Sequence, residues 1–335
     1  MKITVIGAGS WGTAISGVAA AKADRVTLWS HDVESADGIN ARHVNPLYLS
    51  DYMLPDNVDA SCDFAEALDG CDGIIAVVPS AFLRSTIRSA APFVPSDTPV
   101  LCLTKGIEPG TGKLMSEVVS EELGNPRRVA ALSGPNHAEE VCRGSLSAAV
   151  VAAEDPEVAE FFKGLLISPA FRIYTSKDMV GIETCAAVKN VMAIVCGIAA
   201  GSGYGDNTLA LIMTRGLAEI TRIVSARGGN PMTCMGLAGM GDLIATCTSP
   251  HSRNRSFGVA FAKGESLEDY QARTHMVVEG VAAAHSTAQL ARSLGVDAPL
   301  TFALESTLYH GTSIEEALNA LVDRFPTEEF YGITR

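Results

Sequence analysis

The stretch Lys2–Ala14, KITVIGAGSWGTA, decides the fold of the first part of this 335-residue chain. Its opening residues, Lys2–Ile6, form a short apolar and β-branched run, which predicts a buried strand. The next six, Gly7–Gly12, fit the pattern G-x-G-x-x-G, and Thr13–Ala23 has helical character. A strand, a glycine loop and a helix in this order are typical of a dinucleotide-binding turn.

Each glycine of this loop has a physical task in such a turn. Gly7 permits the tight turn, Gly9 lets the backbone approach a pyrophosphate, and Gly12 allows the helix to pack closely on the strand. The amino end of the helix would face the phosphates, where its backbone N–H groups favour negative charge. The loop therefore predicts NAD or NADP as cofactor.

The second predicted strand, Arg25–Trp29, ends without the acidic residue that commonly binds the ribose 2′-hydroxyl of NAD. The residues after it are Ser30-His31-Asp32, so the carboxylate of Asp32 comes slightly late, and His31 suits a 2′-phosphate. The sequence leaves the choice between NAD and NADP open.

Strand-like and helix-like segments alternate as far as about Tyr174, which predicts a Rossmann-type α/β domain with a doubly wound, mostly parallel sheet. Long alanine- and leucine-rich helical segments follow, and we expect an all-α second domain. We place the domains at residues 1–176 and 177–335. The further strands expected in the first domain are Gly73–Val78, Val100–Thr104, Val129–Ser133, Ala148–Ala152 and Phe171–Tyr174.

Composition excludes several classes of function. The net charge of −13 argues against nucleic acid as a partner. The eight cysteines are scattered without metal-ligand spacing, so we expect neither a structural zinc site nor a disulfide framework. The longest apolar stretch, Val191–Ala200, is too short to span a bilayer. We expect a cytoplasmic protein without membrane insertion.

Two segments that carry candidate functional residues follow predicted strands, at the carboxyl ends where ligands of open α/β sheets bind. The first places Lys105 at the end of Val100–Thr104, although a solvated surface lysine would read the same way. The second is Ser133-Gly134-Pro135-Asn136-His137-Ala138, for which a plain turn is an equal alternative.

Lys189 lies in a helical segment that is apolar on nearly every face, Cys185–Ala193. Burying an ammonium is costly unless it is paired or its pKa falls. A lysine held in this way suits a proton donor or a group that polarises a carbonyl. The alternative is a lysine that snorkels out of the helix.

The last segment runs from Gly239-Met240-Gly241-Asp242 to Ser252-Arg253-Asn254-Arg255. Two arginines and an asparagine follow a hydroxyl-rich stretch, which in so acidic a chain indicates a phosphate or oxyanion site. Asp242 is placed to orient Lys189 or to bind a substrate hydroxyl. A charged surface turn is the alternative.

Together these segments resemble the bacterial glycerol-3-phosphate dehydrogenases that use NAD or NADP. The resemblance runs in order through seven stretches: GAGSWGTA (7–14), TKGIE (104–108), LSGPNHAEEVCRG (132–144), VGIETCAAVKNVMAI (180–194), GYGDNTLALIMTRGLAEI (203–220), GLAGMGDLIATCTSPHSRNR (236–255) and VVEGVAAA (277–284). It implies a Rossmann-type domain, a helical substrate domain, a homodimer and a role in glycerophospholipid synthesis.

The resemblance also implies roles for single residues. Lys189 matches the catalytic lysine, with Lys105, Asn190, Asp242 and Thr246 as its expected supporting groups. Substrate contacts are implied for Lys105, Gly134, Asn136, Lys189, Asp242, Ser252, Arg253 and Asn254. Cofactor contacts are implied for Ser10, Trp11, His31, Tyr48, Lys105, Ala138, Arg253, Val277 and Glu279, beside Gly7, Gly9 and Gly12 of the loop.

The reaction we expect is reversible interconversion of dihydroxyacetone phosphate and sn-glycerol 3-phosphate, without a metal because a lysine polarises the carbonyl. One alternative is a related reductase of a keto or hydroxyacyl substrate, which would not need the Ser252–Arg255 cluster. Another is a cofactor-sensing protein without catalysis, which would have no use for Lys189.

Overall fold

The computed structural model describes residues 1–274, 276–325, 328–329 and 331–333. The chain divides into two compact units, which are described separately below. The first, here called the N-terminal unit, comprises Met1–Lys105 and Met115–Met179, and the second, the helical unit, comprises Gly106–Leu114 and Val180–Arg335.

The N-terminal unit is built on one eight-stranded sheet with the order β3-β2-β1-β4-β5-β6-β7-β8. All neighbouring strands are parallel except β6 and β7, which are antiparallel. The strands are β1 (Lys2–Ile6), β2 (Arg25–Trp29), β3 (Val58–Ser61), β4 (Gly73–Ala76), β5 (Val100–Cys102), β6 (Val129–Ser133), β7 (Ser147–Ala153) and β8 (Phe171–Ser176).

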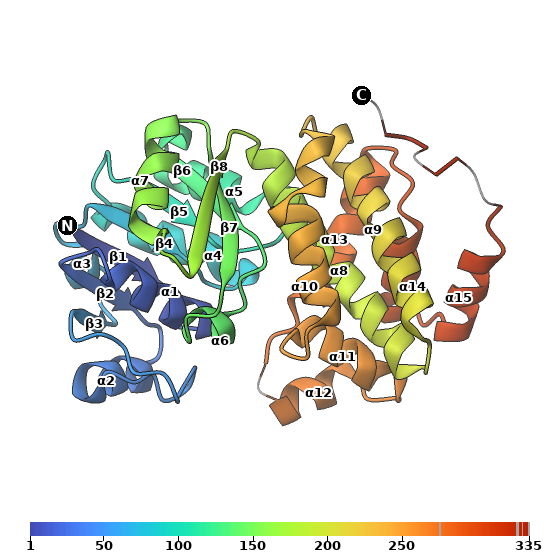
Figure 1. Ribbon diagram of the computed structural model, residues 1–335, viewed down its shortest axis with the longest axis horizontal. Coiled ribbons are helices and arrows are strands. Elements are labelled where there is room, and N and C mark those ends of the chain that lie inside the picture. The colour runs from blue at the N-terminus through green and yellow to red at the C-terminus, as the bar shows by residue number, and fades with distance from the viewer. Residues whose placement is uncertain (275, 326–327, 330, 334–335) are drawn as a thin grey trace. The chain divides into compact units, whose positions relative to one another are not determined.

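Helices cover both faces of this sheet, and the side chains of β1 show why. Ile3 and Val5 point into a core formed with α1, α2 and α7, whereas Ile6 belongs to a second core formed with α3, α4 and α5. The sheet is therefore doubly wound, as predicted (Figure 1). The helices are α1 (Ser10–Ala20), α2 (Val33–Arg42), α3 (Phe64–Leu68), α4 (Ser80–Ala90), α5 (Met115–Leu123), α6 (Ala138–Val141) and α7 (Pro156–Leu166).

The chain order reverses beside β1: β2 and β3 lie on one side of it and β4 to β8 on the other. Ligands of such sheets bind at the carboxyl ends of the strands where this reversal occurs. The glycine loop follows β1 directly, so it lies at that switch point.

Several of the expected boundaries are wrong in detail. The helix after the glycine loop begins at Ser10 rather than Thr13, because Gly9 already serves as its extended N-cap residue. The strands β4 and β5 end at Ala76 and Cys102, two residues earlier than expected. Ser10, Trp11 and Gly12 therefore belong to the first turn of α1.

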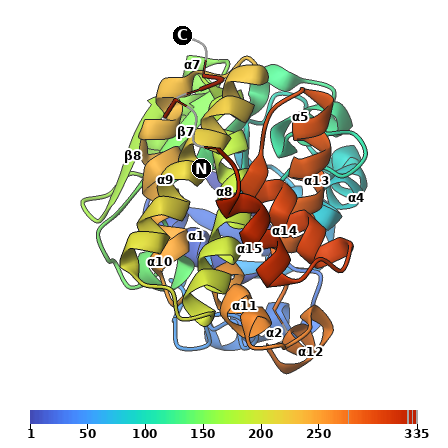
Figure 2. The ribbon, with the colours of Figure 1, turned by 90° about the vertical axis from the view of Figure 1, so that its right-hand side faces the viewer.

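The helical unit contains helices throughout its described part, as predicted. They are α8 (Met179–Gly201), α9 (Asp206–Ala226), α10 (Asp242–Thr248), α11 (Arg253–Ala262), α12 (Leu267–Thr274), α13 (Glu279–Ser293), α14 (Pro299–Tyr309) and α15 (Ile314–Val322). Figure 2 shows α15 on the outside of α14, with which it is in contact.

Helix α8 is the central element of this unit. Among the described helices it is the single one that is long and apolar enough to span a membrane, but 78% of its most apolar window is buried inside the protein. Its apolar side chains join a core with α9, α13 and α14, and Ile107 and Leu114 from the excursion Gly106–Leu114 pack into the same core. This packing explains why that excursion belongs to the helical unit.

A buried carboxylate joins two helices of this unit and makes its stability sensitive to pH. Glu219 of α9 accepts hydrogen bonds from the backbone N–H groups of Leu300 and Thr301, both at 3.0 Å, and from the Thr301 hydroxyl. These groups belong to the first turn of α14. Burial raises the pKa of Glu219 to about 7 despite those donors.

We therefore expect stability to fall as the pH rises from about 4.5 to about 7. In that range the folded protein holds a proton on Glu219 that the unfolded chain has lost, so folding takes up a proton and is favoured at the lower pH. Urea denaturation at several pH values should show this slope, and Glu219→Gln should flatten it. An unchanged slope in the variant would show that Glu219 is not its source.

Candidate active site

The glycine loop owes two of its glycines to close backbone contacts. Gly7 has φ +120°, and a Cβ there would lie 2.8 Å from the Val77 carbonyl oxygen. A Cβ on Gly12 would lie 1.8 Å from the carbonyl oxygen of Gly7. Any larger side chain at either position would force the loop open, since such contacts are far below van der Waals distance.

Gly9 differs from these two, and its surroundings fit a bound dinucleotide. Apart from its chain neighbours and the backbone of its own helix, no heavy atom of the described residues lies within 4 Å of the position that a Cβ on Gly9 would take. Gly9 is also the N-cap of α1, with no side-chain hydrogen bond to the helix end and no acidic residue in the first turn. Space beside the backbone at an amino end without a side-chain cap is what a pyrophosphate requires.

The residues expected at the adenosine end lie at the carboxyl end of β2 and in the following loop. His31 is exposed and lies between the fully buried Ser30 and Asp32, which is the N-cap residue of α2. The strand tip itself is Trp29, stacked on Phe64 at 4.1 Å between ring centroids. Tyr48 is partly exposed.

Trp11 has a packing role besides its expected contact with the cofactor. Its ring meets the ring of Phe171 in β8 edge to face, with 6.4 Å between centroids. Ser10 precedes it as the first residue of α1.

Lys105 and the segment Gly134–Ala138 follow β5 and β6. The hydroxyl of Thr104 donates to the Val78 carbonyl at 2.7 Å and so fixes the backbone just before Lys105. A Cβ on Gly134 would lie 2.5 Å from the Ala148 carbonyl oxygen, which gives this glycine a packing reason. Ala138 is the buried first residue of α6.

Asn136 is the polar residue of this segment that calls for a ligand. It is only 8% exposed, and its Nδ2 group finds no hydrogen-bond partner among the described residues. An unsatisfied buried donor costs on the order of 1–3 kcal/mol. A substrate or cofactor oxygen would remove that cost.

The structure brings Lys189, Asp242 and Thr246 together in the helical unit. The Lys189 ammonium on α8 donates to an oxygen of Asp242 and, at 2.9 Å, to the Thr246 hydroxyl, both on α10. The Thr246 hydroxyl donates in turn to the Asp242 carbonyl at 2.6 Å. The side chains of Lys189 and Asp242 are only 6% and 4% exposed. The buried ammonium is thus paired, and it does not snorkel out.

A π-helical turn, Leu237–Gly241, delivers Asp242 to this position. Such turns are rare and are often found at functional sites. The turn depends on Gly239, because a Cβ there would lie 2.1 Å from the Cys234 carbonyl oxygen. Beside this site, a hydrogen bond with Cys196 and burial raise the pKa of the Cys247 thiol well above its ordinary value.

Ser252, Arg253 and Asn254 form the start of α11. Ser252 is its N-cap, and its hydroxyl accepts from the Arg255 N–H at 3.3 Å. Asn254 is buried, donates to Asn190 Oδ1 at 3.0 Å and accepts from the Gly280 N–H at 2.9 Å. Asn254 therefore joins α11 to α8 through Asn190, the residue that follows Lys189, and to the first turn of α13 through Gly280. Arg253 is exposed.

The helices α8 and α11 cross in direct backbone contact. A Cβ on Gly197 of α8 would lie 2.1 Å from the Arg255 carbonyl oxygen, and a Cβ on Gly258 of α11 would lie 2.3 Å from that of Ile194. This crossing fixes where α11 begins relative to Lys189.

The expected site residues thus fall into one set in each unit. Two further expected residues belong to the helical unit. Val277 is exposed, and Glu279 is the first residue of α13, directly before Gly280, whose N–H donates to Asn254. The N-terminal unit holds Gly7, Gly9, Ser10, Trp11, Gly12, His31, Tyr48, Lys105, Gly134, Asn136 and Ala138, and the helical unit holds Lys189, Asn190, Asp242, Thr246, Ser252, Arg253, Asn254, Val277 and Glu279. The helical unit's charge pair can polarise and protonate a carbonyl oxygen.

Sequence reasoning passed over Asn45, whose side chain contacts the glycine loop. The dipeptide Asn45-Pro46 predicts a turn, but no local pattern predicts that the Asn45 side chain contacts Ala8 and Thr13.

Comparisons with known proteins identify the family of the chain. Residues 2–159 match the family model described as NAD-dependent glycerol-3-phosphate dehydrogenase N-terminus, and residues 178–319 match its C-terminal counterpart. A glycerol-3-phosphate dehydrogenase [NAD(P)+] of Shouchella clausii is 41% identical over 337 residues, which cover 100% of this chain and 99% of that protein. One from Streptomyces griseus is 45% identical, covering 97% of each chain.

A solved structure is similar in the same way. The crystal structure of glycerol-3-phosphate dehydrogenase from Coxiella burnetii superimposes with a TM-score of 0.92 at 37% identity. The match covers 96% of this chain and 99% of that one. The likeness extends through both units.

Proposed function

Because the chain belongs to the NAD-dependent glycerol-3-phosphate dehydrogenase family, we propose that Lys189 is the proton donor of its reaction. The protein interconverts dihydroxyacetone phosphate and sn-glycerol 3-phosphate with NAD(P)H. The family assignment favours this activity over the two alternatives, a reductase of a keto or hydroxyacyl substrate and a non-catalytic sensor.

The observation that carries the proposal is the buried contact of Lys189 with Asp242 and Thr246. In the reducing direction the C2 carbonyl gains a hydride, which the bound dinucleotide provides. Lys189 polarises the C2 oxygen and gives it the proton that balances the hydride. Asp242 and Thr246 hold the ammonium in place, and Asn190 and Lys105 complete the supporting groups. Low exposure strengthens these electrostatic contacts.

The start of α11 binds the phosphate of the small substrate in this proposal. Arg253 supplies a charged donor, Asn254 an amide and Ser252 a hydroxyl, and phosphates are bound well by such groups at a helix amino end. Gly134 and Asn136 of the N-terminal unit are proposed as further substrate contacts, and the unpartnered Nδ2 of Asn136 supports this role. Fixing the phosphate orients the carbonyl carbon for hydride transfer.

For the cofactor, the proposed contacts follow the glycine loop. Gly7, Gly9, Ser10, Trp11 and Gly12 hold the pyrophosphate, and His31 and Tyr48 hold the adenosine end. The remaining proposed contacts are Lys105, Ala138, Arg253, Val277 and Glu279. We propose a dinucleotide-binding domain, 1–176, and a helical substrate domain, 177–335. The two compact units differ from these bounds by Gly106–Leu114, which belongs to the helical unit, and by residues 177–179, which belong to the N-terminal unit.

We also propose that the protein is a cytoplasmic homodimer whose product feeds glycerophospholipid synthesis. These statements extend the resemblance described in the sequence analysis.

A spectrophotometric assay with dihydroxyacetone phosphate and either NADH or NADPH tests the proposal and the cofactor preference. We expect oxidation of the cofactor that depends on the phosphorylated ketone. His31→Ala should weaken the use of NADPH more than that of NADH, because His31 follows a strand tip without a carboxylate. Equal effects on both would remove the assignment of His31 to the 2′-position.

A further inference from the structure

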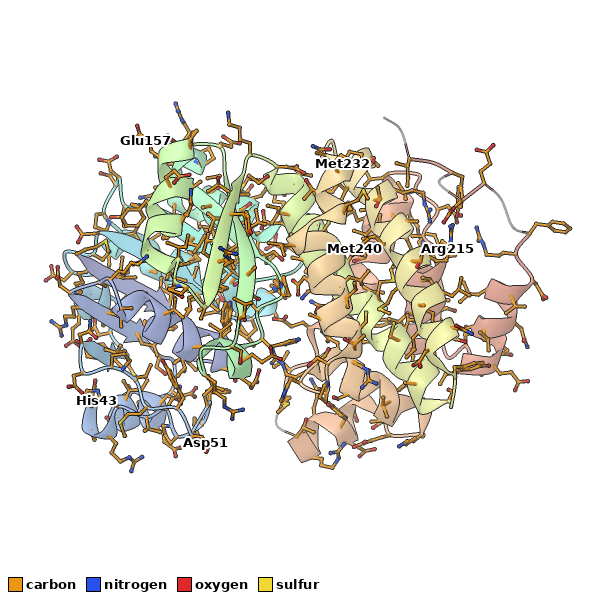
Figure 3. The ribbon with its side chains drawn as sticks, in the orientation of Figure 1. His43, Asp51, Glu157, Arg215, Met232 and Met240 are labelled. Atoms are coloured by element: carbon orange, nitrogen blue, oxygen red, sulfur yellow. The ribbon has the colours of Figure 1, made fainter. Side chains whose placement is uncertain are left out.

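The loop between α2 and β3 contacts the glycine loop, although the two are far apart in the sequence. It begins at His43, in a left-handed conformation with φ +53°, and carries Tyr48. Figure 3 labels His43 and Asp51, which bracket the part of this loop that contains Tyr48.

Asn45 is the residue of this loop that makes the connection. It is fully buried, and its Nδ2 group donates to the Ala8 carbonyl at 2.8 Å and to the Thr13 hydroxyl at 2.9 Å. Its Oδ1 atom accepts from the N–H groups of Leu47 and Tyr48, at 3.1 and 3.2 Å. Both donors and both acceptor positions of the amide are therefore used.

We propose that Asn45 is a positioning residue for cofactor binding, which sets the Ala8–Gly9 peptide of the glycine loop and the backbone of Tyr48 with one side chain. The inference rests on the proposed binding of the dinucleotide by the glycine loop. Asn45 itself does not touch the reacting atoms.

The planarity of the peptide bond explains how the bond to Ala8 reaches the ligand. In a trans peptide the carbonyl of one residue and the N–H of the next point in opposite directions. The hydrogen bond that draws the Ala8 carbonyl toward Asn45 therefore fixes the Gly9 N–H on the opposite side. Gly9 is the loop residue with open space beside it.

The same amide acts on the adenosine side. By accepting from Leu47 and Tyr48, Oδ1 closes a tight turn and fixes the backbone from which Tyr48 projects. Asn45 thus couples the two parts of the loop region assigned to the pyrophosphate and to the adenosine.

The loop has other anchors, so its folding does not depend on Asn45 alone. The N–H of Leu54 donates to the His43 carbonyl at 2.7 Å. The Tyr52 hydroxyl lies so close to Gly17 of α1 that a Cβ on that glycine would come within 2.1 Å of it. A substitution of Asn45 should therefore affect ligand binding more than overall folding.

The test is Asn45→Asp, which keeps the shape of the side chain and both acceptors but removes both donors. A carboxylate would then face the Ala8 carbonyl, and the peptide should turn away. We expect the KM for NAD(P)H and the Ki for ADP, used as a pyrophosphate-bearing fragment, to rise together by about tenfold or more. The kcat and the KM for dihydroxyacetone phosphate at saturating cofactor should stay near those of the wild type.

Asn57→Asp is the matched control. The Asn57 amide also donates to two carbonyls, those of Ala20 and Ala23, at 3.0 and 2.9 Å, but at the other end of α1. It should lower the melting temperature and leave both constants for the cofactor and ADP unchanged. Equal weakening of ADP binding by the two variants would mean that Asn45 acts only through stability, and would overturn the inference.

Gly9→Val separates this inference from the function on which it rests. Weak cofactor binding in Gly9→Val with normal binding in Asn45→Asp would refute the role of Asn45 alone. Normal binding in Gly9→Val would refute the glycine loop as the pyrophosphate site, and the inference with it. If Asn45→Asp does not fold, Asn45→Ala serves, because it removes the same donors without adding charge; normal ADP affinity in that variant would also refute the inference.

Discussion

Lys189→Ala should lower kcat by about 10²- to 10⁴-fold, the range that a positioned acid contributes. The affinity for NAD(P)H should stay nearly intact, because Lys189 belongs to the helical unit and the glycine loop does not depend on it. Steady-state kinetics of dihydroxyacetone phosphate reduction, together with a titration of NADH binding, measure both quantities. Unchanged turnover would end the assignment of Lys189 as proton donor.

The single variant leaves Asp242 buried without its cation, and an uncompensated buried charge is destabilising by roughly 3–5 kcal/mol. The double variant Lys189→Met with Asp242→Asn removes both charges and keeps the volumes similar. It should fold and still show the loss of turnover. A well-folded double variant with normal turnover would contradict the mechanism.

Arg253→Ala should raise the KM for dihydroxyacetone phosphate on the order of 10- to 100-fold, as expected for the loss of hydrogen bonds to a charged group. Inorganic phosphate, tested as a competitive inhibitor, should weaken by a similar factor. Because Arg253 is also proposed as a cofactor contact, the comparison is made at saturating cofactor, where slow turnover of dihydroxyacetone without its phosphate should be equal in the wild type and the variant.

A suitable control for this variant is Arg273→Ala. Arg273 is an exposed arginine of the same unit that pairs with Glu265 rather than with any expected site residue. Its loss should leave the KM unchanged. A normal KM in Arg253→Ala would refute the phosphate role, and an equal rise in both variants would indicate a general effect of net charge.

The parts of the fold that local patterns specify could be predicted from the sequence. The strand Lys2–Ile6 and the glycine loop after it are predictable, because strand periodicity and glycine spacing are patterns within a few consecutive residues. The sequence does not predict strand β3, because its four residues, Val58–Ser61, include only one large apolar side chain. The antiparallel direction of β7 has no local signature either.

For the candidate site, residue types pointed to chemistry but not to partners. A lysine in an apolar helix called for a counterion, and the sequence could name Asp242 only as a candidate. Thr246 follows Asp242 by one turn of α10, so helical periodicity places both side chains on one face, but the contact of that face with Lys189 on α8 arises only once the chain has folded. Asn45 was passed over because its contacts with Ala8 and Thr13 arise only once the chain has folded back on itself.

The crossing of α8 and α11 has a consequence for substrate length. Gly197 and Gly258 bring the two main chains into contact, so the spacing between Lys189 and the start of α11 is set by backbone rather than by adjustable side chains. Exchanging side chains around the site would therefore not lengthen the gap between a carbonyl and a phosphate that bind at its two ends. Acceptance of a phosphorylated ketone one carbon longer would require moving the helix itself.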